Sequence, residues 1–293
     1  MRKHLAFTIN YTPSQTADPV LFCKPMKLAL NGATTMRASL ETDVQAAKAA
    51  GFDYLEIWKA KLGHGSIRDL FKDSGVRPLS INSIEHITFR DERAYDAIKQ
   101  ECRELSRIAA EIECPYIVVV PGRLPSGDVD VVAESVPVLA ELCDIAAEHG
   151  VALAFEFLGQ PDCSVQTLGL AAEIVRETAR DNVGLVIDSF HFYAGGSKLQ
   201  MIEKLDPNLI YIFHINDAEN LPRAELEDRH RLLPGLGILP LREMMAAFRK
   251  IGYDGVASVE IFRPEYWERD PFELAREAKA AAERITCTSE SAS

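Results

Sequence analysis

The segment from Asn182 to Phe192, which reads NVGLVIDSFHF, constrains the fold of this chain more than any other. Its first half, Val183 to Ile187, is a continuous apolar run, which is typical of a strand buried on both faces of a parallel sheet. A carboxylate, Asp188, follows where this strand is expected to end. A charged group there is costly unless it is paired or binds a metal. This pattern is characteristic of a (β/α)₈ barrel, which keeps its active site at the carboxyl-terminal ends of its strands.

Three other strand-like runs also end on polar side chains. VALAFEF contains Glu156, LIYIFHI contains His214 and GVASVEIF contains Glu260. Together with Asp188 they form a ligand set for one divalent cation, because carboxylates with one imidazole suit Mn²⁺, Co²⁺ or Zn²⁺, with Mg²⁺ as the alternative. For any one of them alone, a paired buried polar group would be the simpler interpretation. Four such residues at matching strand ends favour a metal site.

Strand-like and helical patterns alternate from Met26 onward. Strands are expected at residues 27–31, 52–58, 77–82, 116–120, 151–157, 183–187, 209–213 and 256–260. Helical patterns lie between them, such as residues 40–50 with Ser39 as a cap and Gly51 as a stop. This order predicts an α/β fold, a single (β/α)₈ TIM barrel. An open doubly wound sheet is disfavoured because it would gather its ligands at one switch point.

The two ends of the chain lack these patterns. Residues 1–25 have no periodicity and no apolar stretch like that of a signal peptide, so we expect a poorly ordered extension and no export. Residues 26–286 are expected to form the barrel, and residues 287–293 a disordered tail.

Composition narrows the classes of partner. A chain of 293 residues with 47% hydrophobic residues can bury one barrel-sized core. The net charge of −12, without a run rich in lysine or arginine, disfavours nucleic acid and anionic membranes. No apolar run approaches the length of a transmembrane helix. The six cysteines show no paired spacing, which favours reduced thiols and a cytoplasmic protein.

Several side chains have two interpretations. Glu56 and Lys59 near the second strand, and Glu85 and His86 beyond the third, either line the mouth of the barrel or are solvated loop residues. Cys163 lies close to the predicted site, but it has no evident base nearby, so we expect a small packing residue. The longest polar connection follows His214, and long loops on this face of a barrel usually bind substrate or act as lids.

Several stretches resemble the xylose-isomerase-like superfamily of sugar isomerases and epimerases, and within it the inosose (2-keto-myo-inositol) isomerases of bacterial inositol catabolism. The resemblance covers the chain after about Met26. It rests on NGATT (31–35), VVVPG (118–122), EFLGQPDCSV (156–165), RDNVGLVIDSFHF (180–192), FHINDAE (213–219), RLLPGLG (231–237) and SVEIFRPEYW (258–267).

The resemblance implies a role for each matching residue. Glu156, Asp188, His214 and Glu260 would be the metal ligands, and His191 and Arg231 would contact substrate oxygens. It implies a metal-dependent isomerase that moves a carbonyl group to the adjacent carbon of a small polyol or keto-cyclitol through an enediolate. Glu156 and Glu260 would be the catalytic acid and base, in an order that the sequence leaves open. A homo-oligomer is compatible with this prediction.

Other activities use the same barrel. An inosose or 3-dehydroshikimate dehydratase would form the same enolate and expel a hydroxyl group. A ketose 3-epimerase would have a glutamate in the loop after Glu156, where this chain has Asp162. A phosphodiesterase like endonuclease IV would need several metals and a basic face, which a net charge of −12 disfavours. A sugar sensor without catalytic activity would have no need of four ligands.

Overall fold

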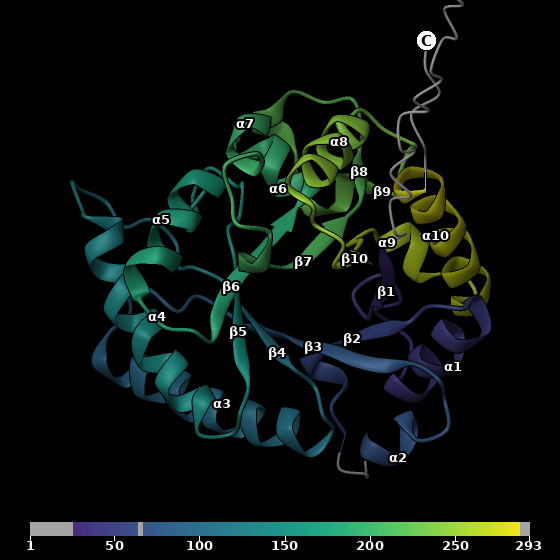
Figure 1. Ribbon diagram of the computed structural model, residues 1–293, viewed down its shortest axis with the longest axis horizontal. Coiled ribbons are helices and arrows are strands. Elements are labelled where there is room, and N and C mark those ends of the chain that lie inside the picture. Colours follow the sequence, from purple (N-terminus) through teal and green to yellow (C-terminus); the bar gives the residue numbers. More distant parts are fainter. Residues whose placement is uncertain (1–25, 64–66, 288–293) are drawn as a thin grey trace, which may run out of the picture.

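The computed structural model describes residues 26–63 and 67–287, and its parallel strands close into a barrel in the order β1-β10-β7-β6-β5-β4-β3-β2 (Figure 1). The predicted TIM barrel is therefore confirmed. The predicted extension, and the tail from residue 288, lie outside the described residues. The barrel strands are β1 (Lys27–Asn31), β2 (Tyr54–Trp58), β3 (Arg77–Ile84), β4 (Tyr116–Val119), β5 (Ala152–Glu156), β6 (Val183–Asp188), β7 (Ile210–Ile215) and β10 (Val256–Val259).

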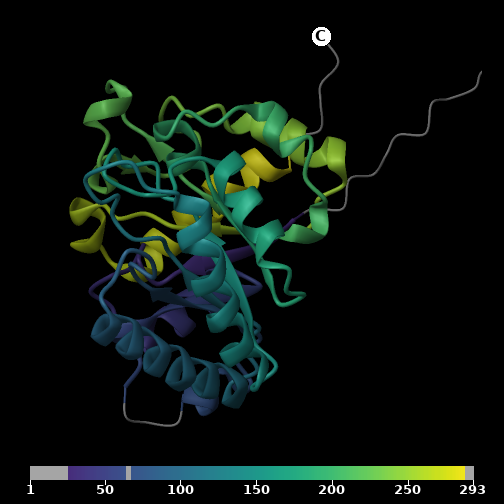
Figure 2. The same cartoon turned by 90° about the vertical axis from the view of Figure 1, so that its left-hand side faces the viewer.

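Helices cover the outside of the barrel, in a ring around the strands in Figure 1 and seen from the side in Figure 2. The helices of the described residues are α1 (Leu40–Ala50), α2 (Ile67–Phe71), α3 (Glu92–Glu111), α4 (Val131–Ala147), α5 (Leu168–Thr178), α6 (Ser189–Ala194), α7 (Leu199–Ile202), α8 (Leu241–Ile251), α9 (Pro264–Trp267) and α10 (Pro271–Thr286). The caps predicted for α1 are present, since the Ser39 side chain accepts a hydrogen bond from the Thr42 backbone and Gly51 is left-handed at φ 81°.

The interior of the barrel changes from apolar to polar along its axis. Ala29, Leu79, Val118, Val120, Ala154, Val186 and Ile212 form an apolar cluster of their own. Side chains on one face of a strand recur every two residues. The residue two positions after Ala154 is Glu156, that after Val186 is Asp188, and that after Ile212 is His214. The apolar layer is therefore a floor to the site: it lies one step along the strands below the layer of polar residues.

The long connection after β7 contains a feature that the sequence pattern did not predict. A two-stranded antiparallel pair, β8 (Asp217–Ala218) and β9 (Arg231–Leu232), brings the start and the middle of this loop together. Asp217 fixes the pair to the following turn, because its carboxylate accepts hydrogen bonds from the backbone of Ala218, Gly235 and Leu239 at 2.8–3.0 Å. Gly237 is required there, since a Cβ would lie 2.1 Å from the Ala218 carbonyl oxygen. The PGLG segment forms a tight turn, in which the Leu236 N–H group donates to the Leu233 carbonyl oxygen at 3.1 Å.

Among residues 26–63 and 67–287, no helix has the length and apolar character needed to cross a membrane.

The role of Asp217 can be tested by substitution. We expect Asp217→Asn to lower the free energy of unfolding by about 2 kcal/mol, because an amide puts a donor where the carboxylate accepts backbone N–H groups. Equilibrium denaturation in urea measures this change. Asp128→Asn, at an exposed position, is the matched control. Equal stabilities of the two variants would contradict the assignment.

Candidate metal centre

Four side chains converge at the carboxyl-terminal mouth of the barrel. Glu156, Asp188, His214 and Glu260 each place one ligand atom within 4.8 Å of the others. The first three end or lie near the ends of β5, β6 and β7, and Glu260 directly follows β10. All four are buried, with exposed fractions of 5% or less. Carboxylates at this depth require a cation or donors, so the donor set fits a divalent metal.

The orientation of the His214 ring identifies its ligand nitrogen. Nδ1 lies 3.0 Å from Glu156 Oε1, 3.1 Å from Glu260 Oε2 and 3.8 Å from Asp188 Oδ2. Nε2 faces the opposite way, 3.0 Å from Glu56 Oε1. Nδ1 is therefore the nitrogen directed at the cluster, and Nε2 is placed to donate its proton to Glu56. A histidine held by a carboxylate in this way is common at metal sites, because the contact fixes the ring and its tautomer.

Glu56 is a site residue whose role was not predicted from the sequence. It is the third residue of β2 and has no exposed surface, so its interpretation as a solvated loop residue is wrong. The Ser80 hydroxyl lies 2.6 Å from Glu56 Oε2, and the Asn31 amide donates to Oε1 at 3.1 Å. Burial by itself would raise the pKa of this carboxyl, but the facing His214 ring outweighs it, and the pKa is lowered. The signal for this role in the sequence was an acidic residue between two apolar ones, Leu55 and Ile57, both of which are fully buried in the structure.

Arg231 lies inside the site rather than on the surface of a loop. Its side chain is 1% exposed. Nη1 is 2.7 Å from Asp188 Oδ2 and 3.1 Å from Glu260 Oε2, so one guanidinium group contacts two of the predicted ligands. The Asp228 carboxylate accepts from Nε and Nη2 on the other side. Burial would raise the pKa of Asp188, but the charge of Arg231 prevails and lowers it to about 2.

His191 lies next to Arg231. Its Nε2 is 3.0 Å from Arg231 Nη2, and because arginine can only donate, Nε2 accepts. Burial, together with the charge of Arg231, lowers the pKa of His191, so the ring is neutral and carries its proton on Nδ1. Nδ1 is buried and has no hydrogen-bond partner among the described residues. The described residues therefore leave the hydrogen-bonding capacity of this N–H group unused.

A cavity of about 230 Å³ adjoins the cluster. It is smaller than the sites that hold drug-sized ligands, which suits a small ligand. Its lining residues are Trp58, Asn82, Ser83, Glu85, His86, Val120, Glu156, Leu158, Gln160, His191, Asp228, Arg231, Glu260 and Phe262. Glu85 and His86 thus line the mouth, whereas Lys59 pairs with Glu101 of α3 at 2.8 Å. Burial raises the pKa of Cys163 to about 11, as expected for a packing residue.

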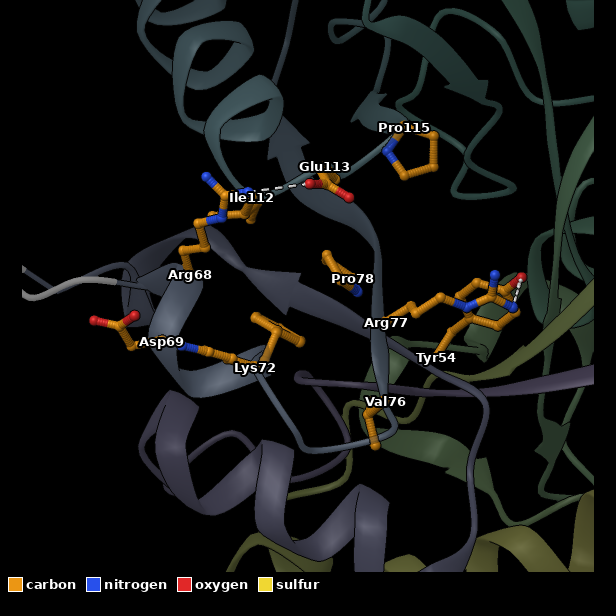
Figure 3. Close-up of a pocket in the computed structure, with 11 residues that line it drawn as sticks. Tyr54, Arg68, Asp69, Lys72, Val76, Arg77, Pro78, Ile112, Glu113 and Pro115 are labelled. Carbon is orange, nitrogen blue, oxygen red and sulfur yellow. Dashed lines mark hydrogen bonds and ion pairs between the residues drawn. The ribbon is translucent and has the colours of Figure 1, made fainter.

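A larger cavity of about 670 Å³ lies elsewhere (Figure 3). It is lined by Tyr54 at the start of β2, Arg77 at the start of β3 and Pro115 just before β4, together with residues around α2. These are amino-terminal strand ends, on the side of the barrel opposite the cluster. Active sites of TIM barrels lie at the carboxyl-terminal ends, so the smaller cavity is the candidate active site.

Comparison with known proteins gives concordant results. Residues 44–285 match a family model described as xylose isomerase-like TIM barrel. The chain is 37% identical to an inosose isomerase of Bacillus velezensis over 89% of its length and 97% of that protein. It is 29% identical to a 3-dehydroshikimate dehydratase of Pseudomonas aeruginosa, of which it covers 37%. A 1.8 Å crystal structure of IOLI protein with a binding zinc atom superposes with a TM-score of 0.85, at 36% identity, over 89% of this chain and 98% of that one.

The contact between Glu56 and His214 predicts an effect on metal affinity. Glu56→Gln should weaken binding of Zn²⁺ about 10- to 100-fold, because the His214 ring loses the carboxylate that orients it and increases its basicity. Competition with a chromophoric chelator measures the affinity. Glu101→Gln, which removes an acid on the outer surface, is the control. Equal affinities in the two variants would show that Glu56 does not act on the metal centre.

Metal affinity should also depend on pH. Burial raises the pKa of Glu156 to about 7, whereas the surrounding carboxylates, which outweigh burial, raise that of His214 well above its ordinary value. The metal-free cluster therefore holds protons that a cation must displace, and affinity should rise with pH through about 7 and above. Calorimetric titration in buffers of different ionisation enthalpy counts the protons released. An affinity that stays constant across this range would contradict the prediction.

Proposed function

The chain belongs to the xylose isomerase-like TIM barrel family, and we propose that it is an inosose isomerase, which moves the carbonyl group of a keto-inositol to the adjacent carbon. One observation carries the proposal. A buried cluster of three carboxylates and one imidazole adjoins a small cavity in a chain that aligns with inosose isomerases over almost its whole length.

We assign the metal ligands to Glu156, Asp188, His214 and Glu260. Their oxygens and the single imidazole nitrogen suit Zn²⁺, Mn²⁺ or Co²⁺, with Mg²⁺ as the alternative. The zinc atom of the related IOLI structure favours Zn²⁺ among these ions. When bound, the cation supplies Lewis-acid polarisation of the substrate carbonyl.

Glu156 and Glu260 are the proposed acid and base. One removes the proton from the hydroxyl-bearing carbon beside the carbonyl, which gives an enediolate. The other returns a proton to the former carbonyl carbon, while the proton of the original hydroxyl group passes to the former carbonyl oxygen, so that the carbonyl group has moved by one position. Their surroundings differ, since Glu260 accepts hydrogen bonds from Asn31 and Arg231, whereas the described contact of Glu156 is with His214. Glu260 is thus held in place more firmly, which favours Glu156 as the carboxylate that moves with the proton.

Arg231 and His191 are the proposed partners of substrate oxygens. The guanidinium group carries a permanent charge beside the cluster, and the His191 ring offers an N–H group without a partner among the described residues. Both can donate to an oxygen that becomes negatively charged as the proton leaves carbon. A well-placed donor of this kind typically contributes about 3 kcal/mol to transition-state stabilisation.

The structure of the loop after β5 favours an isomerase over the rival activities. A 3-epimerase of this superfamily would place a further glutamate in that loop. Here Asp162 is 58% exposed, forms an ion pair with Arg123 and does not line the cavity. The similarity to 3-dehydroshikimate dehydratase covers a minor part of that protein, and water loss would need an additional acid at the leaving hydroxyl group.

We further propose that the enzyme works in the cytoplasm on a small keto-cyclitol. The described cysteines are free thiols, and four of them are buried, which suits a reducing compartment. The acidic charge disfavours nucleic acid and membrane surfaces as partners. A homo-oligomer is compatible with this assignment.

The decisive experiment follows the reaction of inosose in heavy water. The metal-loaded enzyme should yield an isomeric keto-inositol with deuterium on the carbon that receives the proton, because the acid exchanges with solvent. Glu156→Gln and Glu260→Gln should each lower kcat at least about 100-fold, whereas the surface variant Glu101→Gln should not. Nuclear magnetic resonance locates both label and carbonyl. Product without carbon-bound deuterium would contradict the proton transfer, and loss of water would identify a dehydratase.

A further inference from the structure

We propose that Asn82 and His86, at the carboxyl-terminal end of β3, form a subsite that recognises the hydroxyl groups of the substrate farthest from the reacting carbons. We call this pair the β3 subsite. The inference rests on the proposed function, because it concerns the same cavity and the same ring-shaped polyol. It adds residues that determine which polyol is accepted, in contrast to the cluster, which acts on any neighbouring ketone and alcohol.

The topology places the β3 subsite across the cavity from the metal centre. In the closed strand order, three strands separate β3 from β7 in either direction around the barrel. His214 belongs to β7, and Asn82 and His86 line the same cavity as Glu156 and Glu260. A ring with its ketone and adjacent hydroxyl at the cluster therefore turns its remaining hydroxyl groups toward β3.

Asn82 has an unused hydrogen-bonding group. Its side chain is 2% exposed, and the Ser80 hydroxyl lies 2.6 Å from one atom of its amide. The other polar atom of the amide makes no hydrogen bond with a described residue. A ligand hydroxyl can therefore bind this atom without breaking a hydrogen bond between described residues. Ser80 also lies 2.6 Å from Glu56, so the amide is tied to the network that holds His214.

His86 is held in an unusual conformation at the same wall. Its φ of 55° lies in the left-handed region, which costs a residue other than glycine of the order of 1–3 kcal/mol. Its Nδ1 is buried without a partner among the described residues. One nitrogen of the ring is therefore left without a hydrogen bond in this part of the chain. Backbone strain together with unused polar atoms in a cavity wall is the combination expected of a binding residue.

The chemistry of the β3 subsite points to hydroxyl groups rather than to charged ones. A neutral amide and an imidazole can each donate to or accept from a hydroxyl. Sites that hydrogen-bond a substrate hydroxyl discriminate strongly against analogues that lack it, because the buried protein groups are then left without partners. The Trp58 and Phe262 rings pack edge to face, with their centroids 5.5 Å apart. They add an apolar wall, which cannot distinguish a substrate with a hydroxyl group from one without it.

The test combines variants with altered substrates. The variants are Asn82→Ala and His86→Asn, the latter chosen because asparagine tolerates a positive φ. The substrates are inosose and the mono-deoxy inososes that lack one hydroxyl outside the reacting pair. We expect each variant to lower kcat/KM for inosose about 10- to 100-fold, mainly through KM. We expect the wild-type enzyme to have a kcat/KM lower by a similar factor for one of the deoxy compounds than for inosose. The variant that lacks the matching side chain should have the same kcat/KM for that compound and for inosose.

Several measurements make the outcome unambiguous. Elemental analysis should show unchanged metal content, and Asn208→Ala and His149→Asn are controls at positions outside the cavity. If the substitution and the missing hydroxyl group each lower kcat/KM independently, so that the two factors multiply in the variant, the β3 subsite is overturned even if inosose is isomerised. If inosose is bound but not isomerised, the proposed function fails, and the same comparison made with dissociation constants from calorimetry still tests the subsite. If metal-loaded wild type does not bind inosose, both proposals fail.

Discussion

The arrangement of charges at the mouth of the barrel is the constraint on which the rest of the site depends. Four carboxylates, those of Glu56, Glu156, Asp188 and Glu260, lie buried within a few ångströms of one imidazole. Arg231 is the permanent cation in contact with two of them. Burying unpaired charge is strongly destabilising, so a divalent ion would relieve an unfavourable arrangement of the metal-free protein. We therefore attribute the expected affinity for metal to the excess of buried carboxylates at the mouth of the barrel.

Two parts of the chain with different sequence patterns build this site. The strands deliver ligands by their period of two, on top of an apolar floor that fixes their height along the barrel. The β8–β9 pair delivers Arg231 from 43 residues beyond Asp188, held in register by the Asp217 carboxylate. The strands hold the four predicted ligands, whereas the loop places the charge of Arg231 against two of them. Changes in this loop can alter the chemistry without altering the cluster.

The sequence was sufficient for the barrel and for the convergence of the four predicted ligands, because buried parallel strands read as apolar runs and a polar residue at their end stands out. It was insufficient where that contrast is missing. Glu56 lies within its strand rather than after it, so the pattern did not distinguish it from a residue at the mouth. The pair of two-residue strands has no periodicity to detect. The burial of Arg231 could not be foreseen, because arginine is mostly exposed unless it is paired, and its partners lie far away in the sequence.

The positions of the two glutamates explain why this geometry suits moving a carbonyl group. In the closed strand order, β6 and β7 lie between β5 and β10, so Glu156 and Glu260 reach the cavity from separate directions. Isomerisation removes a proton from one carbon and delivers one to its neighbour, which two separated carboxylates can do without turning the substrate. Arg231 touches Glu260 and Asp188 together, so its charge lies where negative charge collects on the substrate oxygens. Recognition at β3 would then fix the remaining freedom, the rotation of the ring that decides which neighbouring carbon gives up its proton.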